Sequence, residues 1–246
     1  MNNISSSAKL GKNVKIGNNN IIGDNVIISD NVVIGSNNKF FANNIIYDNV
    51  EIGDGNVFLD GGIIGEHPVN MDEFIDKVYN GVKIGNNNYF HYNTVVSGGT
   101  TANKTIIGDN NKISRNVYIA HDCIITNNVH IYPKVFVCGH CTLMPYSGVG
   151  VNASLRQFSV LGSYSFIGMG TPVTKNIFPY FIYAGNRYLR MNTKRVPEEF
   201  HKYEIDLKKL LESYKILSKE ALNESISIYP EQINKNLRIY FKDYIL

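Results

Sequence analysis

His121 and the polar residues that follow it are the side chains of this 246-residue chain best suited to do chemistry. Asp122 comes directly after His121, and a second histidine, His140, follows Gly139. A histidine can take a proton from a hydroxyl or an amine, and backbone N–H groups can stabilise an oxyanion. If the fold brings such groups together with an amide such as Gln157, they form a plausible catalytic site with a general base and oxyanion donors.

Cysteine and basic residues near these positions suggest other kinds of site. The string Cys138-Gly139-His140-Cys141 imitates a metal or redox spacing, but the chain has no second cysteine pair, so we expect no metal. An odd number of cysteines favours reduced thiols over a disulfide framework. A basic run could bind phosphate groups or the acidic surface of another protein, or could simply be solvated. The run consists of Arg187, Arg190, Lys194 and Arg195.

Composition excludes several classes of protein. Charged residues make up 18% of the chain and the net charge is only +3, so a nucleic-acid partner is not expected. No apolar run reaches the ~18 residues of a transmembrane helix. The start of the chain lacks the charged and apolar regions of a secretory signal. The expected location is therefore the cytoplasm.

An apolar residue recurs at every sixth position through most of the chain. The repeat runs from Ile4 to Ile64, from Ile84 to Val96 and from Ile107 to Val173, and all 26 positions are apolar. A period of six fits neither a helix nor one long strand, but it fits short strands that turn a corner every six residues. Three such faces close a coil of about 18 residues, with the apolar positions inside a prism.

Asparagine is unusually abundant, with 33 residues. Clusters such as Asn18–Asn20 and Asn86–Asn88 fall between the periodic apolar positions. Corners need residues that tolerate left-handed backbone angles, and asparagine does so better than most. A disordered low-complexity tract would not require an apolar residue at every sixth place.

The repeat predicts which residues stack on one another. Residues 18 apart lie on adjacent coils, about 4.8 Å from each other, and no insertion interrupts residues 107–173. The two neighbouring columns are predicted to be His121, Gly139 and Gln157, and Asp122, His140 and Phe158. A histidine, a glycine N–H and an amide therefore meet on one corner. We expect two other histidines, His91 and His130, to be ordinary surface residues at corners.

Two insertions and a change in composition define the rest of the architecture. Residues 65–82 and 97–106 break the repeat and are predicted to be loops, which commonly carry function. From Pro197 the apolar residues take helical spacing, and a second helix is predicted to begin near Pro230. We therefore predict a β-helix domain over residues 1–196 and an α-helical extension over residues 197–246.

The sequence resembles the left-handed parallel β-helix acyltransferases. Within them it is most similar to the acyl-carrier-protein-dependent UDP-N-acetylglucosamine O-acyltransferases of lipid A synthesis. The segments that carry the likeness are Ile119–Cys123, Cys138–His140, Arg156–Phe158 and Pro179–Asn186. The resemblance implies a homotrimer with active sites between prisms. It also implies an acyl carrier protein or coenzyme A thioester as donor, a nucleotide-sugar acceptor, and neither a bound cofactor nor a metal.

The same resemblance assigns roles to residues. It implies that His121 is the general base, that Asp122 orients it, and that the N–H of Gly139 stabilises the oxyanion. Contacts to the nucleotide sugar or the donor would come from His140, Gln157, Asn186, Arg187, Arg156 and Tyr118. Met169 falls where the family measures the acyl chain, and its size suggests a short or medium acyl group, although ordinary packing explains it equally well.

Three departures from the family pattern concern the acceptor pocket. Tyr118 and Arg156 replace histidines, and His67–Asp72 replaces a loop that usually carries a Gln-Asp pair. Two alternatives therefore stay open. One is an acetyl-CoA-dependent acetyltransferase of nucleotide sugars for surface glycans, although the Gly-x-Pro-Ala ending usual there is absent. The other is a β-helix scaffold without catalysis, against which the placement of His121 and Asp122 argues.

Overall fold

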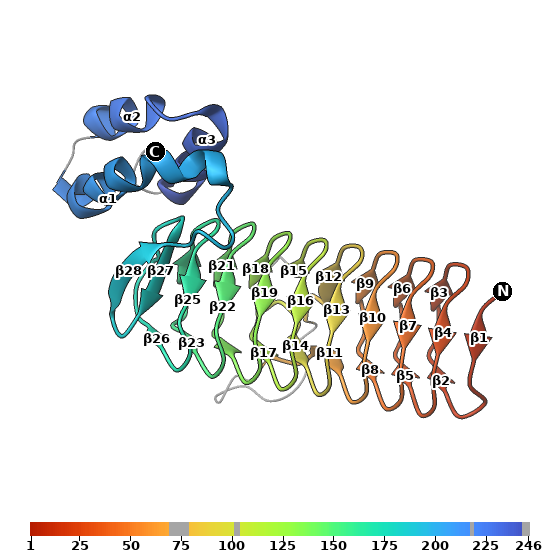
Figure 1. Ribbon diagram of the computed structural model, residues 1–246. Coiled ribbons are helices and arrows are strands. Elements are labelled where there is room, and N and C mark those ends of the chain that lie inside the picture. The colour runs from red at the N-terminus through yellow and green to blue at the C-terminus, as the bar shows by residue number, and fades with distance from the viewer. Residues whose placement is uncertain (69–78, 101–103, 217–218, 243–246) are drawn as a thin grey trace.

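The chain folds into a long three-sided prism with a group of helices at its C-terminal end (Figure 1). The computed structural model describes residues 1–68, 79–100, 104–216 and 219–242. Most of the predicted loop 65–82, including positions 69–72 of its His67–Asp72 stretch, lies outside the described residues.

Three parallel sheets form the faces of the prism, with strands that are mostly two residues long. The first sheet contains β1 (Asn3–Ile4), β4 (Ile21–Ile22), β7 (Lys39–Phe40), β10 (Val57–Phe58), β13 (Tyr89–Phe90), β16 (Lys112–Ile113), β19 (His130–Ile131), β22 (Gly148–Val149), β25 (Phe166–Ile167), β27 (Phe181–Ala184) and β28 (Arg187–Met191). The second contains β2 (Lys9–Leu10), β5 (Ile27–Ile28), β8 (Ile45–Ile46), β11 (Ile63–Glu66), β14 (Val95–Ser97), β17 (Tyr118–Ile119), β20 (Phe136–Val137), β23 (Ser154–Leu155) and β26 (Pro172–Val173). The third contains β3 (Lys15–Ile16), β6 (Val33–Ile34), β9 (Glu51–Ile52), β12 (Val82–Ile84), β15 (Thr105–Ile107), β18 (Ile124–Ile125), β21 (Thr142–Leu143) and β24 (Val160–Leu161).

Strand register confirms the predicted coil. Ile4 pairs with Ile22 and Ile119 pairs with Val137, each 18 residues apart. The nine strands of the second sheet, one to a coil, give about nine coils. The two insertions do not shift the stacking of the inward-facing apolar residues. Ile84 still pairs with Ile52 on the coil before it, although the longer insertion, residues 65–82, lies between them. The predicted parallel β-helix is therefore correct.

Asparagine serves the coil in two ways. The first was predicted: thirteen asparagines hold positive φ at the corners, as at Asn116 with φ 56°. The second was not. A column of fully buried asparagines links one coil to the next by side-chain hydrogen bonds, as when the backbone N–H of Asn56 donates to Oδ1 of Asn38 at 2.8 Å. The ladder is formed by Asn20, Asn38, Asn56, Asn88 and Asn111.

The core consists of two buried clusters. The first is the stack of aliphatic and aromatic side chains inside the prism, where Phe58 lies between Phe40 and Phe90 at ring-centroid distances of 4.7 and 4.6 Å. The second joins the last coils to the helices, and in it Asn236 donates a hydrogen bond of 2.8 Å to the hydroxyl of Tyr180.

The helical elements follow the prism with one more helix than predicted. The 3-10 helix η1 spans Glu198–Tyr203, α1 spans Glu204–Ser213, η2 spans Tyr214–Ile216, α2 spans Lys219–Ser227 and α3 spans Glu231–Tyr240. Starts near Pro197 and Pro230 were predicted, whereas the separate helix α2 and the antiparallel hairpin β27–β28 were not. Within the described residues, no helix has the length and apolarity needed to cross a membrane.

Candidate active site

The predicted columns meet at the corner between β17 and β18, where the second sheet passes into the third. The backbone N–H of His140 donates to the carbonyl of His121, and that of Phe158 donates to the carbonyl of Gly139, each at 3.0 Å. Consecutive coils are thus bonded turn to turn, as the spacing of 18 predicts. Asp122 (φ 56°), His140 (φ 58°) and Phe158 (φ 66°) occupy the left-handed position that asparagine fills at most other corners.

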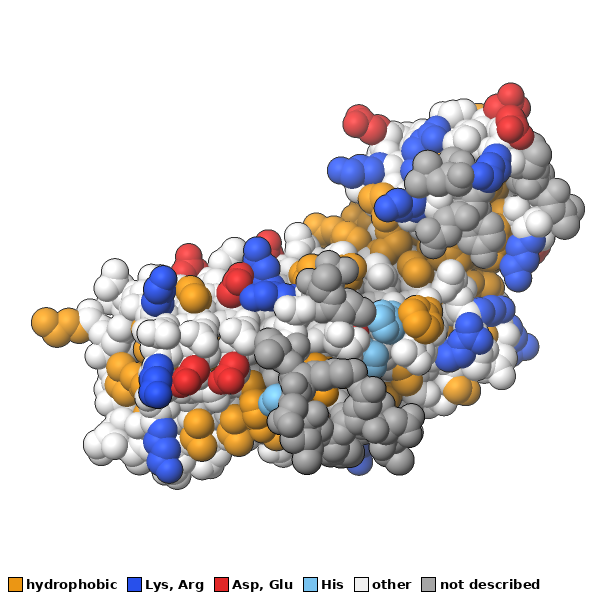
Figure 2. All heavy atoms as spheres, turned by 180° about the vertical axis from the view of Figure 1, so that it is seen from behind, with side chains coloured by type: hydrophobic (Ala, Val, Ile, Leu, Met, Phe, Trp, Pro, Cys, Tyr) orange, Lys and Arg blue, Asp and Glu red, His pale blue; other side chains and the backbone are white. Residues whose placement is uncertain are grey.

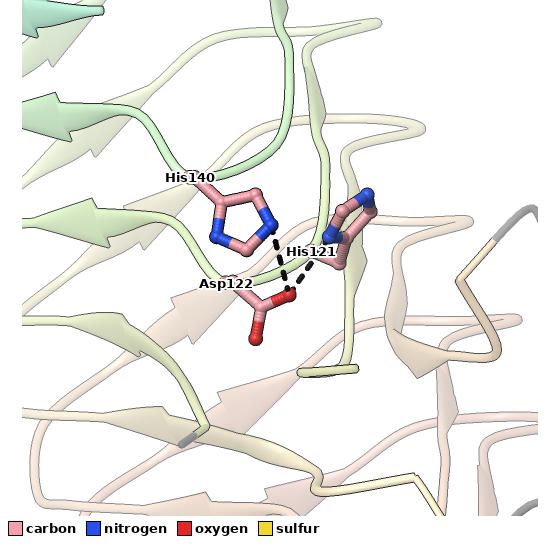
Figure 3. Close-up of side chains that lie close together, drawn as sticks. All are labelled: His121, Asp122 and His140. Carbon is pink, nitrogen blue, oxygen red and sulfur yellow. Dashed lines mark hydrogen bonds and ion pairs between the residues drawn. The ribbon is translucent and has the colours of Figure 1, made fainter. Parts of the chain in front are cut away.

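His121 is oriented by the carboxylate of Asp122 (Figure 3). Nδ1 of His121 lies 2.8 Å from Oδ2 of Asp122. The carboxylate can only accept hydrogen bonds, so Nδ1 carries the proton and Nε2 keeps its lone pair. The imidazole is therefore held in the tautomer that a general base requires.

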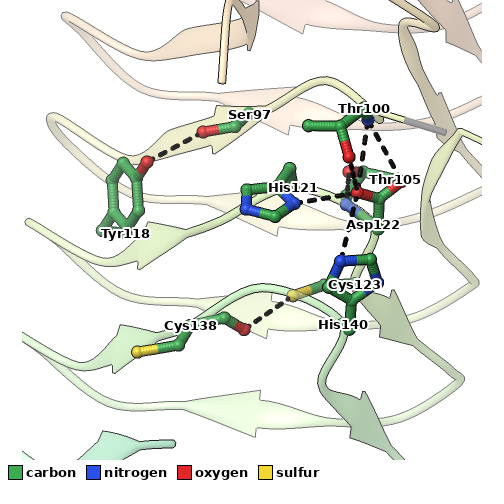
Figure 4. A network of polar contacts seen from close by, with 9 residues as sticks. All are labelled: Ser97, Thr100, Thr105, Tyr118, His121, Asp122, Cys123, Cys138 and His140. Atoms are coloured by element: carbon green, nitrogen blue, oxygen red, sulfur yellow. Dashed lines mark hydrogen bonds and ion pairs between the residues drawn. The ribbon is translucent and has the colours of Figure 1, made fainter. Parts of the chain in front are cut away.

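Asp122 is itself fixed by the coil on the N-terminal side. Its side chain is only 4% exposed. The backbone N–H and the hydroxyl of Thr100 both donate to its carboxylate, and its own N–H donates to Oγ1 of Thr105 at 2.9 Å (Figure 4). Both threonines belong to the predicted loop 97–106. This insertion therefore supplies the support that holds Asp122 against His121.

Gly139 lies directly against the His121 ring. A Cβ built on Gly139 would be 2.6 Å from Cε1 and 2.8 Å from Nε2 of His121, closer than any side chain tolerates. A larger residue here would require the imidazole to move, and the Gly139 backbone therefore lies beside the atom that would remove a proton. The N–H of Gly139 donates to no acceptor among the described residues, so it is available to a ligand.

His140 is the second histidine of the corner. Its Nε2 lies 3.7 Å from Oδ2 of Asp122, and its ring stacks on Phe158 with centroids 4.6 Å apart. Phe158 is 64% exposed, so the stack forms part of the open wall of the site. The His140 ring also meets His121 edge to face, with centroids 5.2 Å apart.

These three side chains are also the one group of possible metal ligands found among the described residues. One ligand atom each of His121, Asp122 and His140 lies within 4.8 Å of the others. The cysteines do not join them. Cys141 is buried in the core, and Cys123 is buried with its thiol directed at the carbonyl of Cys138 at 3.2 Å.

Tyr118 belongs to a series of hydrogen-bonded side chains that the spacing of the repeat did not predict. Its hydroxyl lies 3.0 Å from Oγ of Ser97, and Oγ of Ser97 lies 3.2 Å from Oε1 of Glu66. Burial raises the pKa of Glu66, and the hydrogen bond from Ser97 opposes this effect. Burial likewise raises the pKa of Tyr118. The Tyr118 ring stacks on Phe136 at 4.6 Å, which fixes its direction.

Other predicted residues lie above the corner or on a different face. Gln157 continues the column of His121 and is exposed. Arg156, the residue before it, lines a cavity of about 600 Å³ that is also lined by residues of α1. That cavity also gathers Lys175, Arg190, Lys208 and Lys215. Figure 2 shows lysine and arginine side chains collected on the last coils, next to histidines at the surface of the prism.

Asn186, Arg187 and Met169 do not meet His121 within one chain. Asn186 and Arg187 lie at the turn of the β27–β28 hairpin, in the first sheet, and Met169 follows β25 of the same sheet with 76% of its surface exposed. The corner of His121 joins the other two sheets. A single copy of the chain therefore leaves these three residues away from the base.

A second basic cavity of about 670 Å³ lies on the first sheet. It is lined by Arg190, Lys194, Arg195 and His130 together with Tyr132 and other aromatic and amide side chains. The prediction that His130 is an ordinary corner residue is wrong, because it lies on β19 with the segment around Arg195 beside it. Burial, Arg195 and Lys112 lower the pKa of His130 to about 4.

Known proteins resemble this chain in repeat and in sequence. The family model described as bacterial transferase hexapeptide (six repeats) matches residues 104–139. An acyl-[acyl-carrier-protein]–UDP-N-acetylglucosamine O-acyltransferase of Nautilia profundicola is 35% identical over 134 residues, covering 52% of this chain and 52% of that protein. One of Aliivibrio salmonicida is 32% identical over 130 residues, covering 50% and 47%. The chain therefore matches about half the length of these curated relatives.

Solved structures extend the likeness. The UDP-N-acetylglucosamine acyltransferase of Bacteroides fragilis superposes with a TM-score of 0.86 at 28% identity, covering 98% of this chain and 97% of that one. The enzyme of Francisella novicida superposes with a TM-score of 0.81 at 27% identity, covering 98% and 89%. The chain is thus a hexapeptide-repeat protein that resembles UDP-N-acetylglucosamine acyltransferases in sequence over half its length and in fold over nearly all of it.

Proposed function

We propose that the protein is an acyltransferase that moves an acyl group, such as a hydroxyacyl group, from acyl carrier protein to a UDP-amino sugar, as in lipid A synthesis. The observation that carries the proposal is the arrangement at His121. Its Nδ1 shares a hydrogen bond with a buried carboxylate, and its Nε2 lies against the backbone of Gly139, where an added Cβ would overlap the ring. The similarity to acyltransferases named for this donor and acceptor supports the substrate classes.

The proposed reaction is direct transfer. Nε2 of His121 takes the proton as a hydroxyl or amine of the sugar attacks the thioester carbonyl. The positive charge that develops on the ring is stabilised by Asp122, and the oxyanion is stabilised by the N–H of Gly139. The tetrahedral intermediate collapses with loss of the thiolate, which receives the proton from His121. No covalent intermediate with the enzyme and no metal takes part in this scheme.

The walls of the corner suit the two substrates. His140, Gln157 and Tyr118 offer polar atoms around the base, where the sugar would lie. Arg156 and the cationic cavity above it lie on the next coils, in the direction of the helices. We infer that this region receives the donor, because its lysine and arginine side chains complement phosphate and the acidic surface of a carrier protein.

A complete site would require a second copy of the chain. We propose a homotrimer in which the first sheet of one copy faces the His121 corner of the next. Asn186, Arg187 and the second basic cavity would then reach the nucleotide, and exposed Met169 would limit the length of the acyl chain. The division into a β-helix domain over 1–196 and a helical extension over 197–246, and the cytoplasmic location, stay predictions.

A matrix of donors and acceptors tests the proposed function. The purified protein is incubated with acyl carrier protein thioesters of graded length, or with acetyl-CoA, and with UDP-N-acetylglucosamine or other UDP-amino sugars, and products are identified by mass spectrometry. We expect transfer from a carrier-protein thioester to a UDP-amino sugar. Turnover with acetyl-CoA alone would replace the proposal by an acetyltransferase, and no turnover with any pair would favour a scaffold.

A further inference from the structure

The two insertions of the prism deliver Glu66 and Ser97 to Tyr118. β11 and β14 are longer than the usual two residues, and they end just where the insertions leave the prism. Gly65, with φ 84°, makes a bulge between Ile64 and Glu66, and this bulge brings Glu66 opposite Ser97. Both side chains thus depend on the irregular part of the coil.

The hydrogen bonds that link Tyr118, Ser97 and Glu66 all donate in the same direction. The hydroxyl of Ser97 donates its one proton to Oε1 of Glu66, at 3.2 Å. Tyr118 must then give its own proton to Ser97, at 3.0 Å. The oxygen of Tyr118 is left with lone pairs only.

That oxygen lies beside the reacting corner. Tyr118 is on the strand that leads into the turn of His121, and it is partly exposed. Figure 4 shows it on the side of the His121 ring opposite the bond to Asp122, where Nε2 is free. Stacking on Phe136 prevents the ring from turning away.

We propose that Oη of Tyr118 accepts a hydrogen bond from a hydroxyl or amine of the acceptor sugar, and that Ser97 and Glu66 are positioning residues that fix this polarity. The inference rests on the proposed function, since it assigns a contact with the acceptor sugar at that same site. It also gives a reason for the departure at this position. A neutral imidazole can donate or accept, whereas Tyr118 held by Ser97 and Glu66 only accepts, so it selects a sugar group that carries a proton.

Steady-state kinetics of Tyr118→Phe, Ser97→Ala and the double variant test this inference. Tyr118→Phe loses the acceptor oxygen and should raise KM for UDP-N-acetylglucosamine about 10-fold, the effect of one lost hydrogen bond. Ser97→Ala removes the group to which the Tyr118 hydroxyl donates, so that this hydroxyl can donate as well as accept. We expect this variant to raise KM for UDP-N-acetylglucosamine about 3-fold. Because Ser97 acts only through Tyr118, the double variant should match Tyr118→Phe. KM for the thioester donor should not change in any of them.

Tyr203→Phe is the matched control, because Tyr203 is a partly exposed tyrosine on the 3-10 helix η1, away from both the His121 corner and the first sheet. It should leave both KM values unchanged. Deoxy analogues of the sugar provide a second readout: for the one that lacks the donating hydroxyl, wild type and Tyr118→Phe should have equal KM.

Three results would overturn the inference. They are an unchanged acceptor KM in Tyr118→Phe, additive effects in the double variant, or equal losses in donor and acceptor KM. If wild type itself neither binds nor acylates UDP-N-acetylglucosamine, the proposed function fails first, and that outcome is seen before any variant is compared.

Discussion

Side chains other than asparagine hold the left-handed positions at two corners of the last coils. Among the described residues, seven non-glycine residues with positive φ are not asparagine. Three of them, Asp122, His140 and Phe158, belong to the His121 corner, and three others, Tyr146, Tyr164 and Tyr180, belong to another corner. A bulky side chain costs on the order of 1 kcal/mol in this conformation. The three tyrosines stack on one another, whereas Asp122 and His140 contact the imidazole of His121.

Spacing alone predicted part of this corner. The columns of His121 with Gly139 and of Asp122 with His140 follow from a repeat of 18 that nothing interrupts between residues 107 and 173. The contacts of Glu66, Ser97 and Thr100 could not be predicted in this way, because all three lie where the insertions break the count. The close fit of Gly139 under the imidazole also needed atomic positions.

Gly139→Ala tests the fit at the residue scale. The added methyl would overlap the His121 ring, and the ring would have to move away from both Asp122 and the backbone N–H. We expect kcat to fall by about 10²-fold or more, with a smaller change in KM. Gly170→Ala is a useful control, since its Cβ would meet nothing within 4 Å although its φ is 65°. An active Gly139→Ala enzyme would remove the assigned role of this glycine.

At the scale of elements, the corners and the buried asparagine ladder hold the short strands in register. The period of six predicted the strands, and the abundance of asparagine predicted their corners. The buried asparagine ladder was not predicted, because in sequence a ladder residue such as Asn38 cannot be told apart from its left-handed neighbour Asn37. The hairpin β27–β28 and helix α2 lie beyond the repeat, where no period guides the prediction.

Asn56→Ala tests the ladder. Asn56 donates to the carbonyl of Gly85 at 2.9 Å and accepts from the N–H of Asn88 at 2.9 Å, and it is fully buried. Leaving these partners unsatisfied should lower the free energy of unfolding by about 2–4 kcal/mol, as measured by denaturant titration. Asn31→Gly changes a left-handed corner asparagine with φ 57° and should change stability by less than about 0.5 kcal/mol. Equal effects of both substitutions would contradict a special role for the ladder.

The lowered pKa of His130 predicts a pH dependence of stability. Its pKa is about 4 in the folded chain and about 6.5 when unfolded, so between these values the unfolded chain binds more protons. This contribution to stability is therefore complete above pH 6.5 and is lost as the pH falls toward 4. Between pH 7 and 5, Tm of His130→Gln should fall less than that of wild type, by roughly 2–4 °C. If Tm of the variant and of wild type fell equally between pH 7 and 5, His130 would not be responsible for the pH dependence of stability.

At the scale of the whole molecule, the proposed trimer predicts that two faces of the prism carry complementary halves of a site. The His121 corner lies between the second and third sheets, and the second basic cavity and Met169 lie on the first. The helices lie beside the last coils of the prism (Figure 1), and their buried side chains form the second core together with those coils. Multi-angle light scattering should give the mass of three copies of the 27.6 kDa chain. A monomer at working concentration would contradict the proposed intersubunit site, because Asn186, Arg187 and Met169 lie on a different face from His121 within one copy.

The most direct test of the account is the rate of acyl transfer by His121→Ala. With a carrier-protein thioester and UDP-N-acetylglucosamine as substrates, and with folding checked by circular dichroism, we expect kcat to fall by about 10²-fold or more, because the ring that takes the proton is gone. A His121→Ala protein that transfers the acyl group at a near-normal rate would show that the corner of His121, Asp122 and Gly139 is not the active site.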